Sequence, residues 1–567
     1  MNAPTIDRVL LRLEEARAGK GPQARVESLI ARLEKAAFRD AARLLRFHEV
    51  LLYFRAFPSR RAVSKRARRA LSGFRSRVEE LRAAGADLSA FDDSSVAGAA
   101  GTAVTMAFSY EMLRWLDRRC GKSLRIAWDD RDEEDDSDGL GATLPYFLPL
   151  LEEEALADAN VPYPAWIDAA RGRSRSLAWL LRRFEGLPMP REESARLFNF
   201  LGLPVEWKLG RLPLSRTALR LPGPSFFHGT RLLSGRDVSV RAELGKPRLR
   251  ITHFSGAALE RALDAARAAL ATRYRELHGF THGEARGAVR ADGSRGIAIY
   301  FFGLRPDGRL PLRAGFAHLV TRNGAPIGYG DGFTLFERVD LSFNIFPEYR
   351  DGESAFVFAT LLKLYNQLLG SSTFSIEPYQ IGDQNEEAIE SGAFWFYRRL
   401  GFRPASAELE RLALREEARI AADRSHRTSA SVLRRLAGSN MLLETRDSRP
   451  GAWDRFHIRN LGLAVQREMA RSGLSAERLR ERCAERVARI LSLRVSRRPE
   501  TRHRALSDLA LVLDRIPDLS RWRPDEKKAL AAILDAKSGA SEIRYVRLLQ
   551  KHERLRDAVL RIGSARG

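Results

Sequence analysis

The sequence has almost no cysteine. Its 567 residues include only Cys120 and Cys483, which lie far apart and have no other Cys or His at metal-ligand spacing. Disulfide-stabilised domains need clustered pairs of cysteines, and structural zinc sites need Cys and His ligands at short, regular spacings. The sequence therefore predicts a reducing compartment, no disulfide framework and no metal site.

A signal peptide and a long apolar run are also missing. Residues 1–21 lack the basic start and the uninterrupted apolar core of a secretory signal. The least polar run, residues 94–110, is rich in Gly and Ala and is shorter than the roughly 20 residues of a membrane-spanning helix. We expect no membrane span, a cytoplasmic protein, and a buried helix over residues 94–110.

Lysine is scarce, and most of the positive charge comes from arginine. The net charge is +24, yet the first hundred residues contain only Lys20, Lys35 and Lys65. A positive excess of this size is typical of proteins with a polyanionic partner such as nucleic acid. Arginine spread evenly among alanine, leucine and glycine is also what a GC-rich genome produces. Both explanations of the charge stay open at this stage.

Several common catalytic signatures are absent: Walker A, GxSxG, HExxH and a GxGxxG in a Rossmann context. The acidic run at residues 129–138 has the composition of a calcium loop but lacks its alternating ligand spacing and terminal Glu. We expect this run to be a solvated loop. The basic segment 59–82 has apolar residues at helical spacing, which favours an arginine-coated amphipathic helix.

The texture of the sequence divides the chain into three regions and predicts an α+β protein. Residues 1–215 and 408–567 show apolar residues at three- and four-residue steps, which predicts two arginine-rich, all-helical domains. Strand signals alternate with helices across residues 216–407, after a Pro- and Gly-rich seam. A tight turn is expected at Asn323-Gly324. The expected strands cover residues 248–254, 296–304, 312–320, 325–335 and 340–346.

The central region contains one stretch, residues 346–402, with a recognisable order of elements. It has a glycine-containing turn, an apolar helix, a buried strand and a second helix that ends in Leu400-Gly401-Phe402. A glycine turn that enters a helix offers free N–H groups and a positive dipole end to anions. This order resembles the GNAT N-acyltransferase superfamily. The second helix matches the family's pattern at Ala393, Phe396, Tyr397, Arg399, Gly401 and Phe402.

The resemblance implies a GNAT-like mixed sheet with flanking helices, and acyl-CoA as co-substrate. In the family the turn holds the CoA pyrophosphate, and the matching positions here are Arg350, Gly352, Ser354 and Ala355. The family's Tyr protonates the departing thiolate, a role that falls to Tyr397. Glu348 and Glu377 are candidate acceptor bases by position. The sequence departs from the family pattern at Asp351 and Glu353 in the turn, and at Glu390, where the family has Asn.

Polar residues crowd the approach to the second helix and are candidates for binding an acceptor amine: Tyr379, Gln380, Asn385 and Glu387. Carboxylates in such a place attract cations, although acidic residues also suit an ordinary helix start. The leading hypothesis is an N-acyltransferase that moves an acyl group from acyl-CoA to the amine of a small molecule or protein. Alternatives are a Fem-like aminoacyl-tRNA-dependent transferase and a non-catalytic GNAT-like scaffold or sensor that binds a polyanion.

Overall fold

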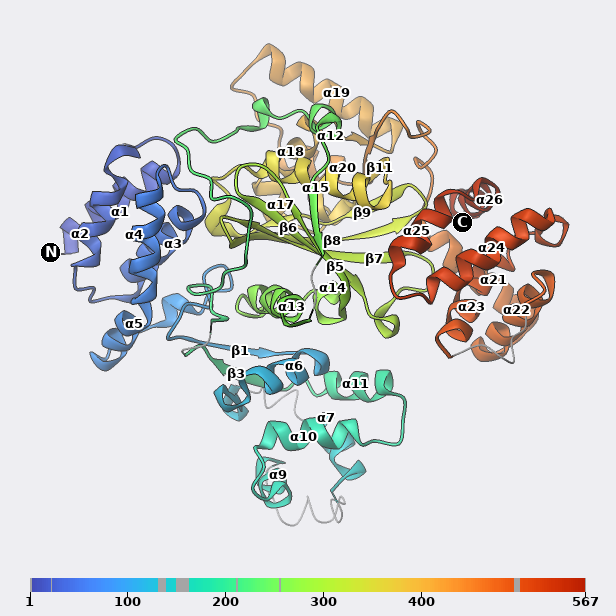
Figure 1. The fold of residues 1–567 in the computed structure, drawn as a ribbon, viewed down its shortest axis with the longest axis horizontal. Helices are drawn as coiled ribbons and strands as arrows, with labels where there is room; N and C mark the ends of the chain where they lie inside the picture. The colour runs from blue at the N-terminus through green and yellow to red at the C-terminus, as the bar shows by residue number, and fades with distance from the viewer. Residues whose placement is uncertain are drawn as a thin grey trace.

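A computed structural model describes residues 3–21, 23–130, 139–148, 163–210, 213–253, 256–493 and 500–565. The protein is a mixed α+β structure, as expected. A ten-stranded sheet occupies the centre, and the N-terminal and C-terminal helices lie on opposite sides of it (Figure 1). Most of the acidic run, residues 131–138, lies outside the described residues.

The N-terminal helices pack into a bundle around α3. Asp40 caps α3 by accepting a hydrogen bond from the Arg43 N–H at 2.9 Å. The basic segment 59–82 forms two amphipathic helices, α4 and α5, because Gly73 separates them. The bundle consists of α1 (Ala3–Arg17), α2 (Val26–Glu34), α3 (Ala41–Ala56), α4 (Arg61–Ser72) and α5 (Phe74–Ala83).

A small antiparallel sheet in the order β1-β3-β2 follows the bundle. The expectation of an all-helical region to residue 215, and of a buried helix over residues 94–110, was therefore wrong. Gly98 and Gly101 both have φ of +92°, which interrupts any helix and leads the chain into β1. The elements here are β1 (Ala103–Ala107), α6 (Tyr110–Cys120), β2 (Leu124–Ile126), α7 (Gly139–Thr143), α9 (Tyr163–Arg171), α10 (Ser176–Glu185), α11 (Arg191–Phe200) and β3 (Pro204–Lys208).

The central sheet has the order β12-β13-β11-β9-β8-β7-β6-β5-β4, with β10 paired to β8. Strands β4 to β9 form an antiparallel meander, whereas β11 runs parallel to β9. Asn323 and Gly324 have φ of +50° and +81° and join β7 to β8, which confirms the expected tight turn. The strands are β4 (Arg250–His253), β5 (Gly283–Asp292), β6 (Ile297–Leu304), β7 (Ala314–Arg322), β8 (Ala325–Leu335), β9 (Arg338–Leu341), β10 (Asn344–Ile345), β11 (Thr373–Ile376), β12 (Arg403–Pro404) and β13 (Met441–Glu444).

Two expectations about the end of this sheet were wrong. Strand β13 belongs to the region expected to be all-helical, yet it pairs with both β11 and β12. The expected second helix, residues 383–402, is divided into α17 and α18 because Gly392 adopts φ of +68°. The helices of the central region are α12 (Val240–Gly245), α13 (Gly256–Ala271), α14 (His278–Thr281), α15 (Ser354–Leu369), α16 (Pro378–Ile381), α17 (Glu386–Glu390), α18 (Ala393–Arg399), α19 (Ala407–Ala422) and α20 (Ala430–Leu436).

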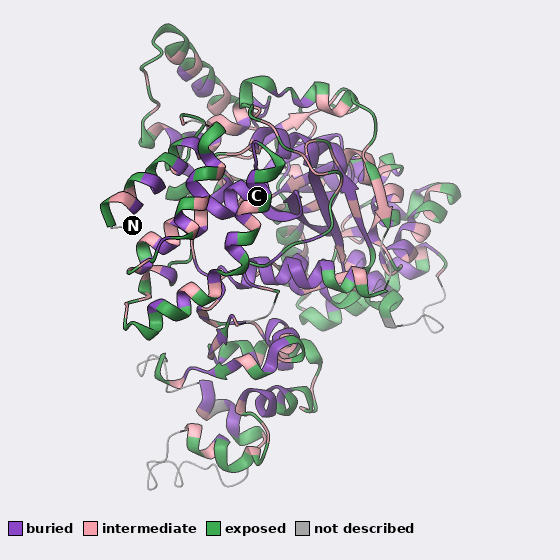
Figure 2. Ribbon diagram, turned by 60° about the vertical axis from the view of Figure 1, so that its left-hand side comes forward, coloured by how far each residue is buried: buried purple, intermediate pink, exposed green. Residues whose placement is uncertain are grey.

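Helices cover both faces of the sheet. Ala317 and His318 are neighbours on β7 and so point to opposite faces. A Cβ on Gly279 of α14 would lie 2.6 Å from the Ala317 side chain, whereas His318 Nδ1 lies 3.1 Å from the Tyr365 hydroxyl of α15. Helix α14 therefore covers one face and α15 the other. The strands between these helices are largely buried (Figure 2).

The C-terminal helices pack against α15 and against β7 and β8 through α25. The Tyr545 hydroxyl of α25 donates to the Leu312 main-chain oxygen at 2.6 Å. These helices are α21 (Ile458–Ser472), α22 (Ala476–Ile490), α23 (Glu500–Leu513), α24 (Pro524–Lys537), α25 (Glu542–Gln550) and α26 (Glu553–Ser564). Among the described residues, no helix has the length and apolar character that crossing a bilayer requires.

Candidate functional site

The turn that enters α15 lies beneath the N-terminal bundle. A Cβ added to Gly352 would lie 2.5 Å from the Phe57 ring, which follows α3 directly. Arg17 of α1 forms an ion pair with Asp351 at 2.6 Å. The hydroxyl of Tyr53 donates to the Asp351 main-chain oxygen at 3.4 Å. Contacts from α1 and α3 therefore cover the turn to which the resemblance assigns a pyrophosphate.

Glu353, the last residue before α15, is fully buried and forms ion pairs with two arginines. Its carboxylate forms ion pairs with Arg322 and, at 2.5 Å, with Arg295. It also accepts a hydrogen bond from the Leu233 N–H at 2.8 Å. The positive charge near the helix entrance is thus matched by a carboxylate of the chain itself. The turn residues do not fit a CoA pyrophosphate in this arrangement, because Glu353 would oppose its charge and Phe57 packs on Gly352.

The remaining predicted cofactor residues are close to the predicted acceptor residues. Arg350 forms an ion pair with Glu387, so residues assigned to two different ligands neutralise each other. Ser354 and Ala355 form the first turn of α15, where Ser354 is half-buried and Ala355 is buried. Asn385 caps α17 by accepting from the Ala388 N–H at 3.2 Å. This cap gives Asn385 a local structural role that the sequence did not assign to it.

Tyr379 and Gln380 lie on the short helix α16. Tyr379 is 58% exposed, which is unusual for a large aromatic side chain, and Gln380 is half-buried. The Asn385 side chain donates to the Tyr379 main-chain oxygen at 3.0 Å and fixes this helix relative to α17. Asn385 and Glu387 have side-chain partners within the chain. Among the described residues, the Tyr379 and Gln380 side chains form no hydrogen bond or ion pair, and both keep exposed surface.

Glu348 is buried and does not have the environment of a base. Arg273 contacts its carboxylate at 2.6 Å and Arg216 at 3.4 Å. Burial alone would raise the pKa of Glu348, but these two guanidinium groups outweigh it and lower the pKa to about 2. A carboxylate with this pKa holds no proton at neutral pH and is a very weak acceptor. The placement argues against the predicted catalytic role of Glu348 and for a structural ion pair.

The same ion pair extends into the N-terminal bundle. Arg216 also contacts Glu49 of α3 at 2.6 Å, and His48 Nδ1 lies 3.0 Å from Glu49. His48 Nε2 in turn lies 2.9 Å from the Thr217 hydroxyl. A continuous buried polar network therefore joins α3, the segment around residue 217 and the turn before α15.

Tyr397 is packed among aromatic rings on the α15 side of the sheet. Its ring centroid lies 5.4 Å from that of Phe358, 5.1 Å from Phe396 and 5.7 Å from Phe402. Burial raises the pKa of Tyr397, so the phenol keeps its proton across the neutral range. A protonated phenol suits the predicted role of general acid, and the aromatic cluster also explains why Tyr397 is at this position. Its assignment stays a prediction.

A second group of carboxylates lies where β10 and β11 diverge. The register sets Phe333 opposite Asp340, and Asp340 opposite Ser375 on β11. Because side chains alternate along a strand, Asp331 and Glu377 extend this same face of the sheet. Strand β10 continues the antiparallel pairing of β9 with β8, and it does not pair with β11. The end of β11 and the middle of β8 therefore present two carboxylates on one face.

The surroundings of these two carboxylates raise the pKa of both. The Ser342 hydroxyl donates to Asp331 Oδ1 at 2.6 Å, yet burial outweighs this bond and raises the pKa of Asp331. The Glu377 side chain keeps exposed surface, but desolvation of its carboxyl group raises its pKa, and the charges of Asp340 and Asp331 act in the same direction. Carboxyl groups with raised pKa values are typical of proton-transfer sites.

Charged and titratable side chains surround Asp331 and Glu377. Asp340 is neutralised by Arg338 at 2.7 Å and by Arg313 at 3.2 Å. His278 of α14 is near enough for its charge to lower the pKa of Asp331. Its ring lies 4.4 Å from that of His282, whose pKa falls to about 4 through burial and the neighbouring charges. We define Asp331, Glu377 and Ser342 as the carboxylate site.

Sequence reasoning identified Glu377 but missed Asp331. The signal that could have found it is local: Tyr329-Gly330-Asp331-Gly332-Phe333 places a carboxylate between two glycines inside an apolar strand. The glycines are required by close neighbours, since a Cβ on Gly332 would lie 2.5 Å from the Tyr365 hydroxyl. A charged residue in such a strand is rarely a packing choice.

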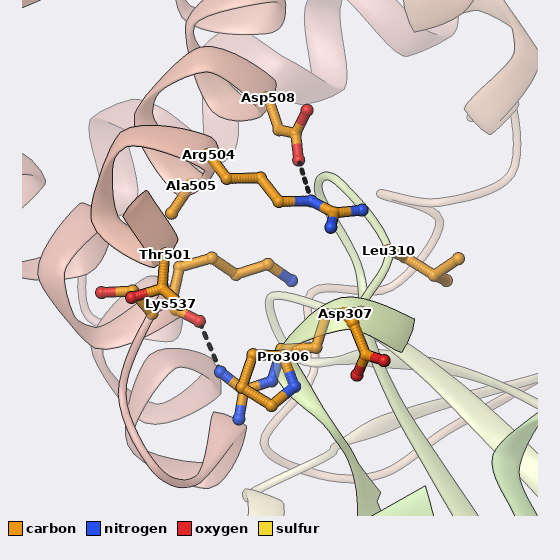
Figure 3. A pocket seen from close by; sticks show the side chains of 10 residues that line it. Pro306, Asp307, Leu310, Thr501, Arg504, Ala505, Asp508 and Lys537 are labelled. Carbon is orange, nitrogen blue, oxygen red and sulfur yellow. Dashed lines mark hydrogen bonds and ion pairs between the residues drawn. The ribbon is translucent and has the colours of Figure 1, made fainter. Parts of the chain in front are cut away.

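A separate cavity of about 340 Å³ lies between the β6–β7 connection and helices α23 and α24. Figure 3 shows Arg504 and Lys537 from the helices beside Asp307 and Leu310 from the connection. Positive and negative side chains alternate around it, and Lys537 already pairs with Glu542 at 2.6 Å. This cavity therefore has no strong preference for a ligand of either charge.

Comparisons with known proteins give no relative on which to base a role. Neither a scan against protein-family models nor searches of curated proteins and solved structures returned a match.

Proposed function

We propose that the protein transfers an acyl group to an amine and that the carboxylate site is where the amine loses its proton. The observation that carries this proposal is the raised pKa of Asp331 and Glu377 on the α14 face of the sheet, where β10 and β11 diverge. The order of strands, turn and helices in the GNAT resemblance supports the same class of reaction. A general base works best when its pKa lies near the working pH.

The proposed reaction is direct attack of the amine on an activated acyl ester. The amine nitrogen forms a bond to the carbonyl carbon, and the bond from that carbon to the leaving sulfur or oxygen breaks. The ammonium proton passes to the carboxylate of Asp331, and the leaving group takes a proton from water, because Tyr397 packs on the opposite, α15 face of the sheet. Ser342 holds the Asp331 carboxylate in place through its 2.6 Å hydrogen bond. Asp331 would contribute about 10²- to 10⁴-fold to the rate.

The donor expected from the resemblance is acyl-CoA. The turn residues do not fit its pyrophosphate, so the proposal requires only an activated acyl ester. An aminoacyl ester carried by tRNA, as in Fem-type transferases, is the second candidate. One observation favours it: Glu353 and Phe57 fill the entrance of α15 with groups of this chain. An acyl donor that binds elsewhere on the protein would not meet Glu353 and Phe57.

The test is a transfer assay with two donors. The purified chain is incubated with acetyl-CoA or with aminoacyl-tRNA, together with spermidine, free lysine or a lysine-containing peptide, and amide products are measured by mass spectrometry. Calorimetric titration with CoA and acetyl-CoA runs in parallel. An amide product from either donor, reduced at least a hundredfold in Asp331→Asn, supports the proposal.

Matched variants separate chemistry from folding. Asp383→Asn removes an exposed carboxylate in the loop between α16 and α17 and should leave transfer unchanged. Glu377→Gln tests the second carboxylate of the site. Absence of product from both donors with every amine would refute the proposal, as would full activity in Asp331→Asn. A product from aminoacyl-tRNA alone would select the second candidate.

A further inference from the structure

A cavity of about 450 Å³ lies where the N-terminal bundle meets the segment that leads into the central region. Helices α3, α4 and α5 surround it, together with residue 210 and residues 215–220. Four of its lining residues are arginines: Arg55, Arg68, Arg75 and Arg220. Hydroxyl groups from Ser72, Ser215 and Thr217 complete the polar lining, and among the residues that the structure describes no carboxylate contributes to it.

Arg55 is the most informative of these residues because it is only 2% exposed. Its guanidinium donates to the main-chain oxygens of Thr217 at 2.6 Å and Arg216 at 3.2 Å. Its Nε has no hydrogen-bond partner, and among the described residues no carboxylate forms an ion pair with Arg55. A buried positive charge without a counter-charge is costly. An anion in the cavity would supply that counter-charge.

The neighbouring arginines add charge that the chain does not neutralise. Arg68 donates to the Ser64 main-chain oxygen at 3.3 Å, and within the described residues neither it nor Arg220 forms an ion pair. Burial lowers the pKa of Arg220, and the positive charges of Arg68 and Arg55 lower it further. Of the four arginines, Arg75 alone has a carboxylate partner among the described residues, Glu79 at 2.6 Å. An anion between these groups would reduce their mutual repulsion.

Another arginine-rich cavity of the molecule shows the contrast. It measures about 510 Å³ and is lined by Arg467, Arg471, Arg486 and Arg515. There Arg486 pairs with Asp514 at 3.3 Å, and Arg515 pairs with Glu468 at 2.7 Å. The chain supplies its own anions at that cavity but not at the one beside Arg55. Arginine content alone therefore does not explain the unpaired cluster.

We propose that the cavity formed by Arg55, Arg68, Arg75 and Arg220 binds the phosphates of a small oligophosphate ligand, either free or carried by a nucleotide. Guanidinium groups bind phosphate oxygens through paired, charge-assisted hydrogen bonds. The Ser215 hydroxyl, which accepts from the Ala218 N–H at 3.3 Å, offers a further donor. A volume of about 450 Å³ lies within the range of small-molecule sites and is too small to enclose a folded partner. This binding role does not depend on the proposed acyl transfer.

The test is calorimetric titration of the full chain with inorganic triphosphate, at low and at physiological salt. Arg68→Gln and Arg220→Gln each remove a guanidinium that is not fully buried, so both variants should fold. Arg12→Gln removes an exposed arginine from α1, outside the cavity, and is the matched control. We expect each cavity variant to weaken triphosphate binding at least tenfold and the control to change it less than twofold.

Titrations with ATP and with a ten-nucleotide RNA identify the source of the phosphate. Comparable affinity for triphosphate and ATP would mean that the phosphates alone are recognised, whereas much tighter ATP binding would mean that the ligand is a nucleotide; both support the proposal. Absence of triphosphate and ATP binding at millimolar concentration would overturn it. Equal losses in Arg12→Gln and the cavity variants would also overturn it, because binding would then follow net charge. Binding of a ten-nucleotide RNA alone, unaffected by Arg68→Gln and Arg220→Gln, would do the same.

Discussion

Arg322, the last residue of β7, forms a buried ion pair with Glu353, the residue that precedes α15. Arg322 also lies over the Phe57 ring, with its guanidinium carbon 4.1 Å from the ring centroid. One side chain thus joins the sheet, the entrance of α15 and the N-terminal bundle. The glycine turn is consequently a structural junction in this chain, whatever ligand the protein binds elsewhere.

Replacement of Glu353 should lower the stability of the protein. Glu353→Gln leaves Arg322 and Arg295 without their shared carboxylate, and breaking a buried ion pair typically costs about 3–5 kcal/mol. We expect a loss of this size in the free energy of unfolding, measured by denaturant titration. Glu390→Gln, at an exposed position of α17, is the control and should change stability by less than about 0.5 kcal/mol. Equal stability of the two variants would contradict the role given to Glu353.

Contact between Gly352 and Phe57 gives a second prediction. Gly352→Ala places a methyl group 2.5 Å from the Phe57 ring and should cost about 1–3 kcal/mol of stability. In a Phe57→Ala background the ring is gone, so the same substitution should cost less. A double-mutant cycle measures the difference as a coupling energy. Additive effects would mean that the bundle does not press on the turn.

The order of the central elements could be predicted from the sequence because strong periodic signals mark them. Residues 297–304 and 325–335 are apolar strands, and Asn323-Gly324 supplies the turn chemistry between β7 and β8. Strand β5 was missed because Gly283–Asp292 is polar and is interrupted by a bulge, where Gly287 has φ of +81°. Strand β13 was missed because its four residues, Met441–Glu444, lie among arginine-rich helices.

The candidate site was harder to predict because distant residues decide its chemistry. Glu348 has an unremarkable local sequence, and its role follows from Arg273, 75 residues away. Asp331 gains its raised pKa from burial that no local pattern reports. Conversely, the turn at residues 350–354 had a local signal for anion binding, but the bundle covers it. Motifs specify local geometry, whereas access and charge balance come from tertiary packing.

Asn323 should act as a tether between the β7–β8 turn and the bundle. Its side-chain amide donates to the main-chain oxygens of Ala56 at 2.9 Å and Phe227 at 2.8 Å, and its oxygen accepts from the Phe227 N–H at 2.9 Å. Asn323→Gly keeps the positive φ and removes only these bonds. We expect faster limited proteolysis between residues 57 and 61 than in the native chain. An unchanged cleavage rate would mean that Phe57 packing alone holds the bundle.

Asp331 should influence the pKa of Glu377 within the carboxylate site. Because the Asp331 charge raises the pKa of Glu377, Asp331→Asn should lower the pKa of Glu377 toward its ordinary value. The pKa can be followed by the carboxyl ¹³C shift of selectively labelled glutamate. Asp383→Asn, which is outside the site, should leave it unchanged. A Glu377 titration unaffected by Asp331→Asn would show that the two carboxylates do not form one site.

His318 should make the protein less stable in mild acid. Its imidazole is fully buried between the sheet and α15, and burial lowers its pKa to about 3, whereas the unfolded chain takes up the proton near the ordinary value of 6.5. The unfolded state therefore binds more protons between these two pH values, so stability falls as pH falls through this window. The slope from one such group is about 1.4 kcal/mol per pH unit.

Denaturant unfolding between pH 7 and pH 4 measures this slope. His318→Gln keeps a polar group beside the Tyr365 hydroxyl but cannot titrate, so its stability should depend less steeply on pH by up to about 1.4 kcal/mol per unit. His253→Gln removes an exposed imidazole on β4 and controls for the loss of one histidine. Parallel pH dependences in native protein and His318→Gln would mean that His318 takes up its proton without unfolding. Other groups, among them Glu348, would then have to account for the acid sensitivity, since the pKa of Glu348 also lies below its ordinary value.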